Sequence, residues 1–149
     1  MKYLRRFNES NSLVVSQCDK SEDSWNFISK FINVIPLEDY LNNINLYQVC
    51  ALDGDKLVGL RIFRMKDGKI HLNYSAVDPD YRNKGLNQKM FEKIWEIAKK
   101  QGVSLITSNV RQSNSKSIKS LLKSGFSIND KVEMFYPDGE KKIPLYYKI

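Results

Sequence analysis

The segment Arg82–Asn87, RNKGLN, contains the residues whose types and spacing are best suited to binding an anion. It lies between Ile70–Val77, which has the composition of a strand, and Leu86–Gln101, whose apolar residues recur at helical spacing. A helix that begins directly after a strand leaves its first backbone N–H groups without partners, and the positive end of its dipole faces the gap. Gly85 lets a ligand come close to the backbone, and the basic side chains of the segment add charge. We therefore expect a phosphate-binding site here.

Two widespread phosphate-binding patterns do not occur in the chain. A dinucleotide site needs Gly-x-Gly-x-x-Gly after a strand, and a P-loop needs Gly-Lys-Ser/Thr at the end of its glycine-rich loop; neither spacing is present. The loop has to be interpreted from the elements around it.

The first half of the chain predicts one strand, two helices and then three strands. Ser12–Gln17 is typical of a strand, and Asp19 with Glu22 three residues later predicts the start of a helix at Asp19. Pro36 opens a second, short helix. The spacing of turn residues then predicts antiparallel strands over residues 46–52, 57–64 and 70–77.

The second half predicts a βαβ unit followed by a helix and a hairpin. The strand at residues 70–77, the helix at 86–101 and a strand at 104–110 form the βαβ unit. A helix over 114–124 ends at Gly125, and 127–136 with 143–149 predicts a hairpin around PDGEKK. We expect an α/β fold in one compact domain over residues 1–149.

Composition excludes several classes of protein. We find no apolar run of about 18 residues that could span a membrane and no signal-peptide pattern, so we expect a cytoplasmic protein without a membrane partner. Cys18 and Cys50 are the two cysteines and His71 is the one histidine, too few ligands for a zinc site. We expect no metal, and we expect both cysteines to be buried free thiols.

Charge is unevenly distributed along the chain, whose net charge is +7. Residues 19–55 hold seven acids and two bases, whereas residues 82–149 hold fourteen bases and six acids. The basic half suits an anion and the acidic half a cation. We expect no nucleic-acid partner, because we find no exposed aromatics or groove-reading element interleaved with the lysines.

Two motifs resemble those of one family. The segment VDPDYRNKGLNQKM is similar to the signature of the GCN5-related N-acetyltransferase (GNAT) superfamily, Gln/Arg-x-x-Gly-x-Gly/Ala after Val-x-Pro at a strand end. The segment NSKSIKSLLKSGF resembles the family's Asn-x-x-Ala/Ser helix that ends in Gly-Phe. The tail MFYPDGEKKIPLYYKI resembles the closing hairpin of ribosomal-protein N-terminal acetyltransferases. The resemblance, best over residues 70–126, implies a single GNAT-like domain with a mixed, mostly antiparallel sheet and a splayed parallel central strand pair flanked by helices.

The resemblance also implies acetyl-coenzyme A as the cofactor. The strand before the loop would pair with the pantetheine arm through its backbone, the loop would hold the pyrophosphate, and the Asn-x-x-Ser helix would supply further contacts. The implied cofactor-binding residues are Ser75, Ala76, Val77, Arg82, Asn83, Lys84, Gly85, Leu86, Asn87, Asn114, Ser117 and Lys123. One departure is Asn87, which stands where the family has its last Gly or Ala. Its side chain would either crowd the pyrophosphate or replace a lost contact.

The implied reaction is acetyl transfer to a primary amine, and the family's usual catalytic positions are changed here. The positions of its glutamate or histidine and of its tyrosine are Asn109 and Leu121, neither of which titrates. Some relatives carry a catalytic tyrosine at the position of His71, and an imidazole is a competent base near neutral pH. We expect His71 as base, or else as a strand residue satisfied by a neighbour. For protonation of the thiolate we expect Tyr136, with Tyr146 and Tyr147 as alternatives.

The acceptor and a second function stay open. Glu38 and Asp39 lie in the acidic stretch that borders the acceptor entrance in this fold, so we expect them to bind a cationic acceptor: a peptide N-terminus, a lysine or a small amine. The alternative function is a catalytically inactive acyl-coenzyme A sensor or interaction module. A homodimer is a further open possibility.

Overall fold

The computed structural model describes residues 12–149, which divide into two compact units. The first takes residues 12–64 and Asn73–Ile97, and the second takes Met65–Leu72 and Ala98–Ile149. The elements of the first half are β1 (Leu13–Gln17), α2 (Glu22–Ser29), α3 (Leu37–Asn42), β2 (Leu46–Asp53), β3 (Lys56–Lys66) and β4 (Lys69–Val77). Those of the second half are η1 (Pro79–Tyr81), α4 (Leu86–Lys100), β5 (Leu105–Arg111), α5 (Ser115–Lys123), β6 (Ser127–Ile128), β7 (Met134–Phe135) and β8 (Lys141–Lys148).

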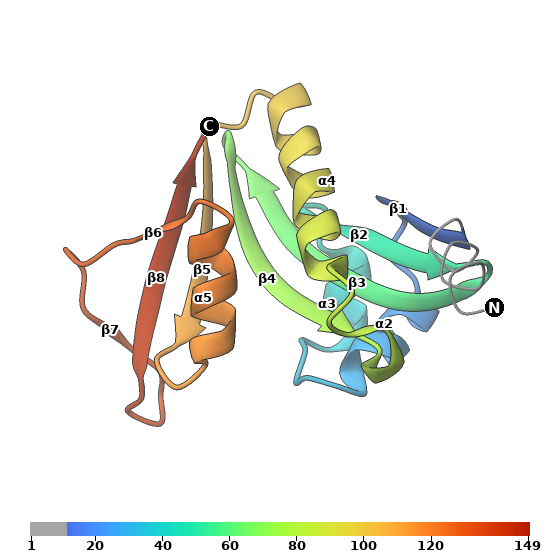
Figure 1. Ribbon diagram of the computed structural model, residues 1–149, viewed down its shortest axis with the longest axis horizontal. Helices are drawn as coiled ribbons and strands as arrows, with labels where there is room; N and C mark the ends of the chain where they lie inside the picture. The colour runs from blue at the N-terminus through green and yellow to red at the C-terminus, as the bar shows by residue number, and fades with distance from the viewer. Residues whose placement is uncertain (1–11) are drawn as a thin grey trace. The chain divides into compact units, whose positions relative to one another are not determined.

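The strands follow the order β1-β2-β3-β4-β5-β8-β6, and β7 pairs with β8 beside this path (Figure 1). The pairs β1–β2, β2–β3, β5–β8, β6–β8 and β7–β8 are antiparallel, whereas β4 and β5 are parallel. The parallel register joins Lys69–Leu72 to residues 105–108 and ends there, although both strands continue. The predicted α/β fold class, with a mostly antiparallel sheet and one parallel pair, is confirmed.

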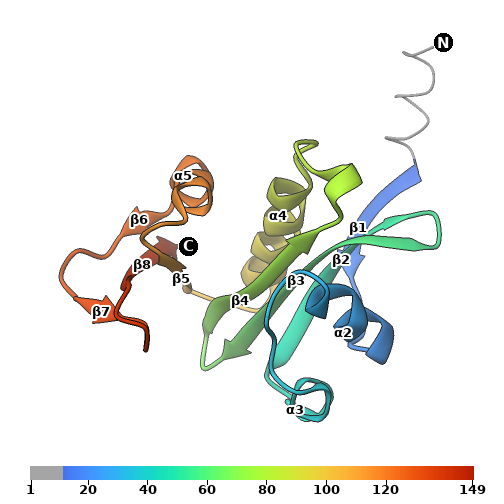
Figure 2. The same ribbon diagram turned by 90° about the horizontal axis from the view of Figure 1, so that it is seen from below.

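In the first unit, helices cover both faces of the sheet: α2 and α3 lie on one face and α4 on the other (Figure 2). The α2 side packs Phe27, Ile28 and Tyr40 against Leu60 and other buried strand residues. On the α4 side, Gly59 makes room for the helix, since a Cβ there would come within 3.3 Å of Met90 Cε. Each large apolar side chain buried this way contributes about 1.5–3 kcal/mol.

Helix α2 begins two residues later than the sequence predicts. The N-cap is Ser21, whose Oγ accepts from Ser24 N at 3.1 Å while Ser21 N donates to Ser24 Oγ at 3.0 Å. This capping box satisfies two backbone donors with serines alone. The predicted cap at Asp19 is therefore wrong, because the reciprocal hydrogen bonds between Ser21 and Ser24 cap the N-terminus of α2.

In the second unit, α5 covers one face of β5 and β8. The Phe126 ring after α5 lies 5.6 Å from the centre of the Tyr147 ring of β8. Leu121, a residue of α5, is buried. The predicted hairpin is interrupted: its first arm forms only β6 and β7, with irregular chain between them, and both pair with β8. No helix from the described residues of this unit covers the opposite face of β5 and β8 (Figure 2).

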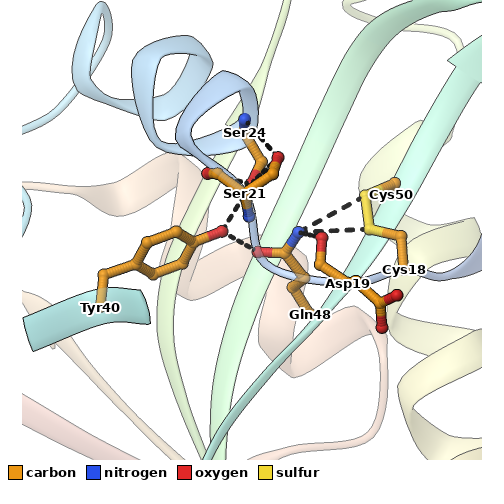
Figure 3. Close-up of a disulfide and its surroundings, with 7 residues drawn as sticks. All are labelled: Cys18, Asp19, Ser21, Ser24, Tyr40, Gln48 and Cys50. Atoms are coloured by element: carbon orange, nitrogen blue, oxygen red, sulfur yellow. Dashed lines mark hydrogen bonds between the residues drawn. A yellow bond between two sulfur atoms is a disulfide. The ribbon is translucent and has the colours of Figure 1, made fainter. Parts of the chain in front are cut away.

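Cys18 and Cys50 form a disulfide, so the prediction of two free thiols is wrong (Figure 3). The register explains the pairing: β1 and β2 are antiparallel with Ser16 opposite Cys50, and Cys18 N continues the ladder by donating to Gln48 O. This brings the two Cα atoms to 6.0 Å, within the range of a disulfide. The two cysteines are 32 residues apart in the sequence, so local sequence patterns did not predict their contact.

Gln48, fully buried, connects the disulfide to the helices of the same unit (Figure 3). Its Nε2 donates to Asp19 O at 3.0 Å and to Cys18 Sγ at 3.3 Å, and its Oε1 accepts from the Tyr40 hydroxyl. The Tyr40 hydroxyl also lies 2.6 Å from Ser24 Oγ in the cap of α2. Burial, the largest influence, raises the pKa of Tyr40, so its hydroxyl stays protonated and donates.

Within residues 12–149, no helix is long and apolar enough to cross a membrane.

Candidate active site

The turn between β4 and α4 has a defined shape. Asp78 Oδ1 accepts from Asp80 N at 2.9 Å, and Tyr81 N donates to Asp78 O at 2.8 Å, which closes the short helix η1. Arg82 Nε then donates to Val77 O at 3.0 Å and ties the start of the loop back to the end of β4. The loop is thus anchored at the strand from which it departs.

Gly85 is required by the backbone conformation of this loop. Its φ is +77°, in the left-handed region that side chains disfavour, and no heavy atom lies within 4 Å of the position its Cβ would take. Asn83 also has a positive φ, +60°, which asparagine tolerates better than most residues. Helix α4 starts immediately afterwards with the buried Leu86. The space around the position of a Gly85 Cβ is therefore open, directly before the helix whose first N–H groups have no intrahelical acceptors.

Two cationic side chains of this loop lie against aromatic rings. The Arg82 guanidinium lies 5.8 Å from the centre of the Phe31 ring, and Lys84 Nζ lies 5.3 Å from the centre of the Tyr81 ring. Both basic residues are exposed. Aromatic contact restricts the direction of the charges while leaving them hydrated, as expected for groups that meet an anionic ligand.

The side chain of Asn87, the departure from the family pattern, is directed to β4. Its Oδ1 accepts from Ser75 Oγ at 2.8 Å, so the amide bridges the first turn of α4 and the strand. Ser75 is half-buried, and Ala76 and Val77 after it are buried. The register of β4 with β5 ends at Leu72, before these three residues.

Arg61 on β3 is a residue of this region that the sequence did not single out. Its Nη1 donates to the backbone oxygen of Asn87 at 3.3 Å, and no carboxylate among the described residues forms an ion pair with it. Burial lowers the pKa of this guanidinium to about 10. A single arginine in the middle of a strand gives no sequence signal; only the contact with α4 identifies it.

In the second unit, His71 belongs to a row of polar side chains on the face of the sheet without a helix. His71 lies opposite Thr107, and Thr107 lies opposite Tyr146. Residues directly opposite in a sheet share a face, and His71 Nδ1 lies 2.7 Å from Thr107 Oγ1. The sequence predicted His71 as a site residue but missed Thr107, because only the strand register brings them together.

Tyr136 lies outside this row. Arg111 Cζ is 4.2 Å from the centre of its ring and Lys142 Nζ is 4.8 Å away. Arg111 follows Thr107 by four residues on β5, about 13 Å along the strand. Burial raises the pKa of Tyr136, although the Arg111 guanidinium acts to lower it, so the phenol is protonated at neutral pH.

The two tyrosines of β8, Tyr146 and Tyr147, lie on opposite faces of the sheet. Tyr146 is the row neighbour of Thr107, with Lys148 Nζ 5.8 Å from its ring centre. Tyr147 points to the opposite face and packs on Phe126. Of the three tyrosines that the sequence offered, Tyr146 lies nearest to His71 in register.

The residues predicted on α5 lie at its start and end. Asn114 is the N-cap, and its Oδ1 accepts from Ser117 N at 3.2 Å, which leaves the amide NH2 group to donate elsewhere. Ser117 is half-buried and Lys123 is exposed in the last turn. Leu121, at the family's tyrosine position, is buried in the core, and Asn109 is half-buried on β5.

The acidic residues predicted to bind the acceptor are exposed. Glu38 and Asp39 lie in the first turn of α3, before the buried Tyr40. A separate cavity of about 420 Å³ opens beside α2 in the same unit. Its lining residues are Asp23, Asn26, Phe27, Lys30, Phe31, Lys56, Leu57 and Asp78. Neither Glu38 nor Asp39 contributes to that cavity.

The chain matches one protein-family model, described as the acetyltransferase (GNAT) family, over residues 13–126. No curated protein matches the chain in sequence.

Solved structures share the fold at low sequence identity. The ribosomal-protein-S18-alanine N-acetyltransferase from Escherichia coli is 20% identical with a TM-score of 0.79, over 92% of this chain and 94% of that one. A Bacillus subtilis acetyltransferase in complex with CoA is 17% identical with a TM-score of 0.75, over 92% and 99%. A chain of the NatC complex bound to Gag peptide and CoA is 17% identical with a TM-score of 0.77, over 93% and 99%.

Proposed function

Because the chain belongs to the acetyltransferase (GNAT) family, we propose that it transfers the acetyl group of acetyl-coenzyme A to a primary amine. The observation that carries this proposal is the loop Arg82–Asn87. Its glycine has a positive φ and open space around its Cβ position directly before α4, and the same loop carries two exposed cations, Arg82 and Lys84. The CoA bound in the similar Bacillus subtilis structure supports the choice of ligand.

The loop would hold the pyrophosphate. The first N–H groups of α4 have no intrahelical acceptors and carry the positive end of the helix dipole, so they favour a phosphate oxygen. Arg82 and Lys84 would neutralise part of its charge, and Asn83, Leu86 and Asn87 would contribute backbone N–H donors. A side chain at position 85 would occupy the open space and would also strain the turn.

The remaining cofactor contacts are proposed residue by residue. Ser75, Ala76 and Val77 would offer their backbone to the pantetheine arm as an added strand does, since the ladder of β4 with β5 ends before them. Asn114 would donate with its amide NH2 group, whose oxygen is already used to cap α5. Ser117 and Lys123 would supply further contacts.

The acceptor amine must lose a proton, and we propose His71 as the base. Bound acetyl-coenzyme A supplies the acetyl thioester, and the chain supplies the proton acceptor. Histidine titrates near neutral pH and can take a proton from an ammonium or an attacking amine. Its position in a row with Thr107 and Tyr146 supports this role better than an isolated strand residue would.

A proton donor to the leaving thiolate is proposed on β8 or on the turn before it. Tyr136 is protonated and held by Arg111 and Lys142, whereas Tyr146 is closer to His71 in register. The variants Tyr136→Phe and Tyr146→Phe separate them: the one that is the donor should lower kcat about 100-fold and leave the acetyl-coenzyme A Kd unchanged.

The acceptor is proposed to be cationic, with Glu38 and Asp39 near its path. Both carboxylates are exposed at the start of α3. The cavity beside α2 adds no net negative charge, because Asp23 and Asp78 line it together with Lys30 and Lys56. Glu38→Gln together with Asp39→Asn should raise the KM for a lysine-containing or alanine-initiated peptide and leave kcat unchanged. An unchanged KM would remove these residues from the acceptor site.

A second candidate is an acyl-coenzyme A-binding module without turnover. It is favoured by Asn109 and Leu121, because neither can move a proton and Leu121 is buried in the core. Release of the free thiol from acetyl-coenzyme A, measured with a panel of peptides and small amines, separates the two functions. Acceptor-dependent release supports the enzyme; saturable binding without release to any acceptor supports the module.

We further propose that the two compact units work as one acetyltransferase domain in the cytoplasm. The family model supports this, since its match includes residues of both units.

A further inference from the structure

The ring of His71 is held by a hydroxyl that has two contacts. Thr107 Oγ1 lies 2.7 Å from His71 Nδ1 and 3.5 Å from the backbone oxygen of Ile70, the residue before the histidine. Thr107 and His71 are directly opposite in the parallel register of β4 and β5, so two strands fix this geometry. Both residues are half-buried.

The Thr107 hydroxyl has one proton, so it can donate in only one of these two contacts. A hydroxyl can donate once and accept twice, whereas a carbonyl oxygen only accepts. If Thr107 donated to Nδ1, no proton would lie between its oxygen and Ile70 O, and only one hydrogen bond would form. If His71 Nδ1–H donates to Thr107, the hydroxyl proton is available to Ile70 O and two hydrogen bonds form. Among Nδ1, the hydroxyl and Ile70 O, the second arrangement forms one hydrogen bond more than the first and is therefore favoured.

We propose that Thr107 is a positioning residue that holds the neutral His71 ring in the Nδ1–H tautomer. In a neutral imidazole one nitrogen carries the proton, so this tautomer leaves the lone pair on Nε2. A hydrogen bond from Nδ1–H to an oxygen also stabilises the imidazolium that forms when Nε2 takes up a proton.

The role of this tautomer in the reaction rests on the proposed function. Nε2 accepts a proton from the acceptor amine, the amine nitrogen forms a bond to the thioester carbonyl carbon, and the C–S bond breaks. The released thiolate takes up one proton, so protons and electrons balance. The tautomer itself does not depend on that reaction.

The single histidine of the chain makes the tautomer directly measurable. In protein labelled with 15N-histidine, all ring-nitrogen signals come from His71. Two-bond couplings to the ring protons distinguish Nδ1 from Nε2, and the protonated and lone-pair nitrogens resonate far apart. Above the pH at which the ring becomes neutral, the proposal expects Nδ1 to carry the proton. A proton on Nε2 in the unmodified protein overturns it.

Two variants test whether Thr107 is the cause. Thr107→Val keeps the shape and removes the acceptor, so the proton should move to Nε2 or be shared; Thr107→Ser keeps the hydroxyl and should keep the Nδ1–H tautomer. An unchanged tautomer in Thr107→Val overturns the role of Thr107. If Thr107→Val does not fold, the unmodified protein and Thr107→Ser still test the proposal, because a proton on Nε2 in either of them contradicts it.

Steady-state kinetics provide a second, independent test. With an alanine-initiated peptide as acceptor, Thr107→Val should lower kcat roughly 10-fold and leave the KM for acetyl-coenzyme A unchanged, and Thr107→Ser should restore kcat. A protein without activity that still shows the Nδ1–H tautomer would contradict the proposed function alone. An active protein with its proton on Nε2 would contradict the inference alone.

Discussion

Ser75 Oγ donates to Asn87 Oδ1 at 2.8 Å, so the side chain at the position where the family has glycine or alanine is tied to strand β4. The bond ties the amide oxygen to the strand, so we expect Asn87 to replace a small residue without filling the proposed pyrophosphate site.

This bond predicts different effects for two substitutions of Asn87. Asn87→Ala loses the bond but leaves the space open, so the Kd for coenzyme A should change less than 3-fold. Asn87→Asp keeps an acceptor for Ser75 and adds a negative charge beside the phosphates, which should weaken binding about 10-fold. Calorimetric titration with coenzyme A checks both. Equal affinities of the aspartate variant and the unmodified protein would contradict this position for the phosphates.

Arg61 leads to a prediction about stability. Its guanidinium is partly removed from water and forms no ion pair with a carboxylate of residues 12–149. Burial lowers its pKa to about 10, so the folded protein holds the charged form at a cost. Arg61→Met should leave the thermal unfolding temperature unchanged or raise it. The exposed Arg64→Met on the same strand is the matched control. A large fall in the unfolding temperature for Arg61→Met alone would mean that its bond to Asn87 O stabilises α4 more than burial of the charge costs.

The disulfide should contribute measurably to stability. It closes a segment with a sequence separation of 32 residues, and a loop of that size corresponds to about 3–4 kcal/mol in the chain-entropy account. Reduction, or Cys50→Ser, should lower the denaturant midpoint accordingly. Thiol titration of denatured protein prepared without reductant should detect no free thiol. Two free thiols per chain would contradict the pairing.

Asp53 predicts a pH dependence of stability. Hydrogen bonds from Ser12 Oγ at 2.6 Å and from the Tyr81 hydroxyl hold the pKa of this carboxyl below its ordinary value. The native state therefore favours the carboxylate: the stabilisation is fully present above the unfolded pKa of about 3.9 and is lost as the pH falls through the lower folded pKa. Asp53→Asn should unfold at lower temperature than the unmodified protein at pH 7, and the difference should shrink toward pH 3.

The neighbouring Asp55 supplies the control for that series. It is exposed in the same turn, and Asp55→Asn removes the same charge without touching Ser12 or Tyr81. Equal unfolding temperatures of the two variants at every pH would show that net charge, not the hydrogen bonds to Asp53, sets the dependence.

The order of elements could be predicted because it depends on local patterns. Apolar periodicity identified α4 and α5, and turn residues identified the hairpins of β2 to β4. The loop Arg82–Asn87 could be predicted for the same reason, since a strand, a glycine and a helix follow one another within a few residues. The parallel pairing of β4 with β5 followed from the helix between them.

Contacts between distant segments could not be predicted. The pairing of Cys18 with Cys50, the contact of His71 with Thr107 and the bond from Arg61 to Asn87 O all depend on strand register or on how a helix lies on the sheet. Two local errors had a different cause. Asp19 and Glu22 have the spacing of a capping box, but Ser21 and Ser24 form the cap of α2. The segment before β8 is too irregular to form a continuous strand.

The central claim is that the loop before α4 binds the pyrophosphate of acetyl-coenzyme A, and calorimetric titration with this ligand tests it most directly. Gly85→Glu places a carboxylate in the open space. Gly102→Glu is the matched control, because Gly102 also has a positive φ, +70°, and open space around its Cβ position, at the other end of the helix. The account predicts saturable binding by the unmodified protein and by Gly102→Glu, and none by Gly85→Glu. Binding by Gly85→Glu with unchanged affinity, or no binding by the folded unmodified protein, would contradict it.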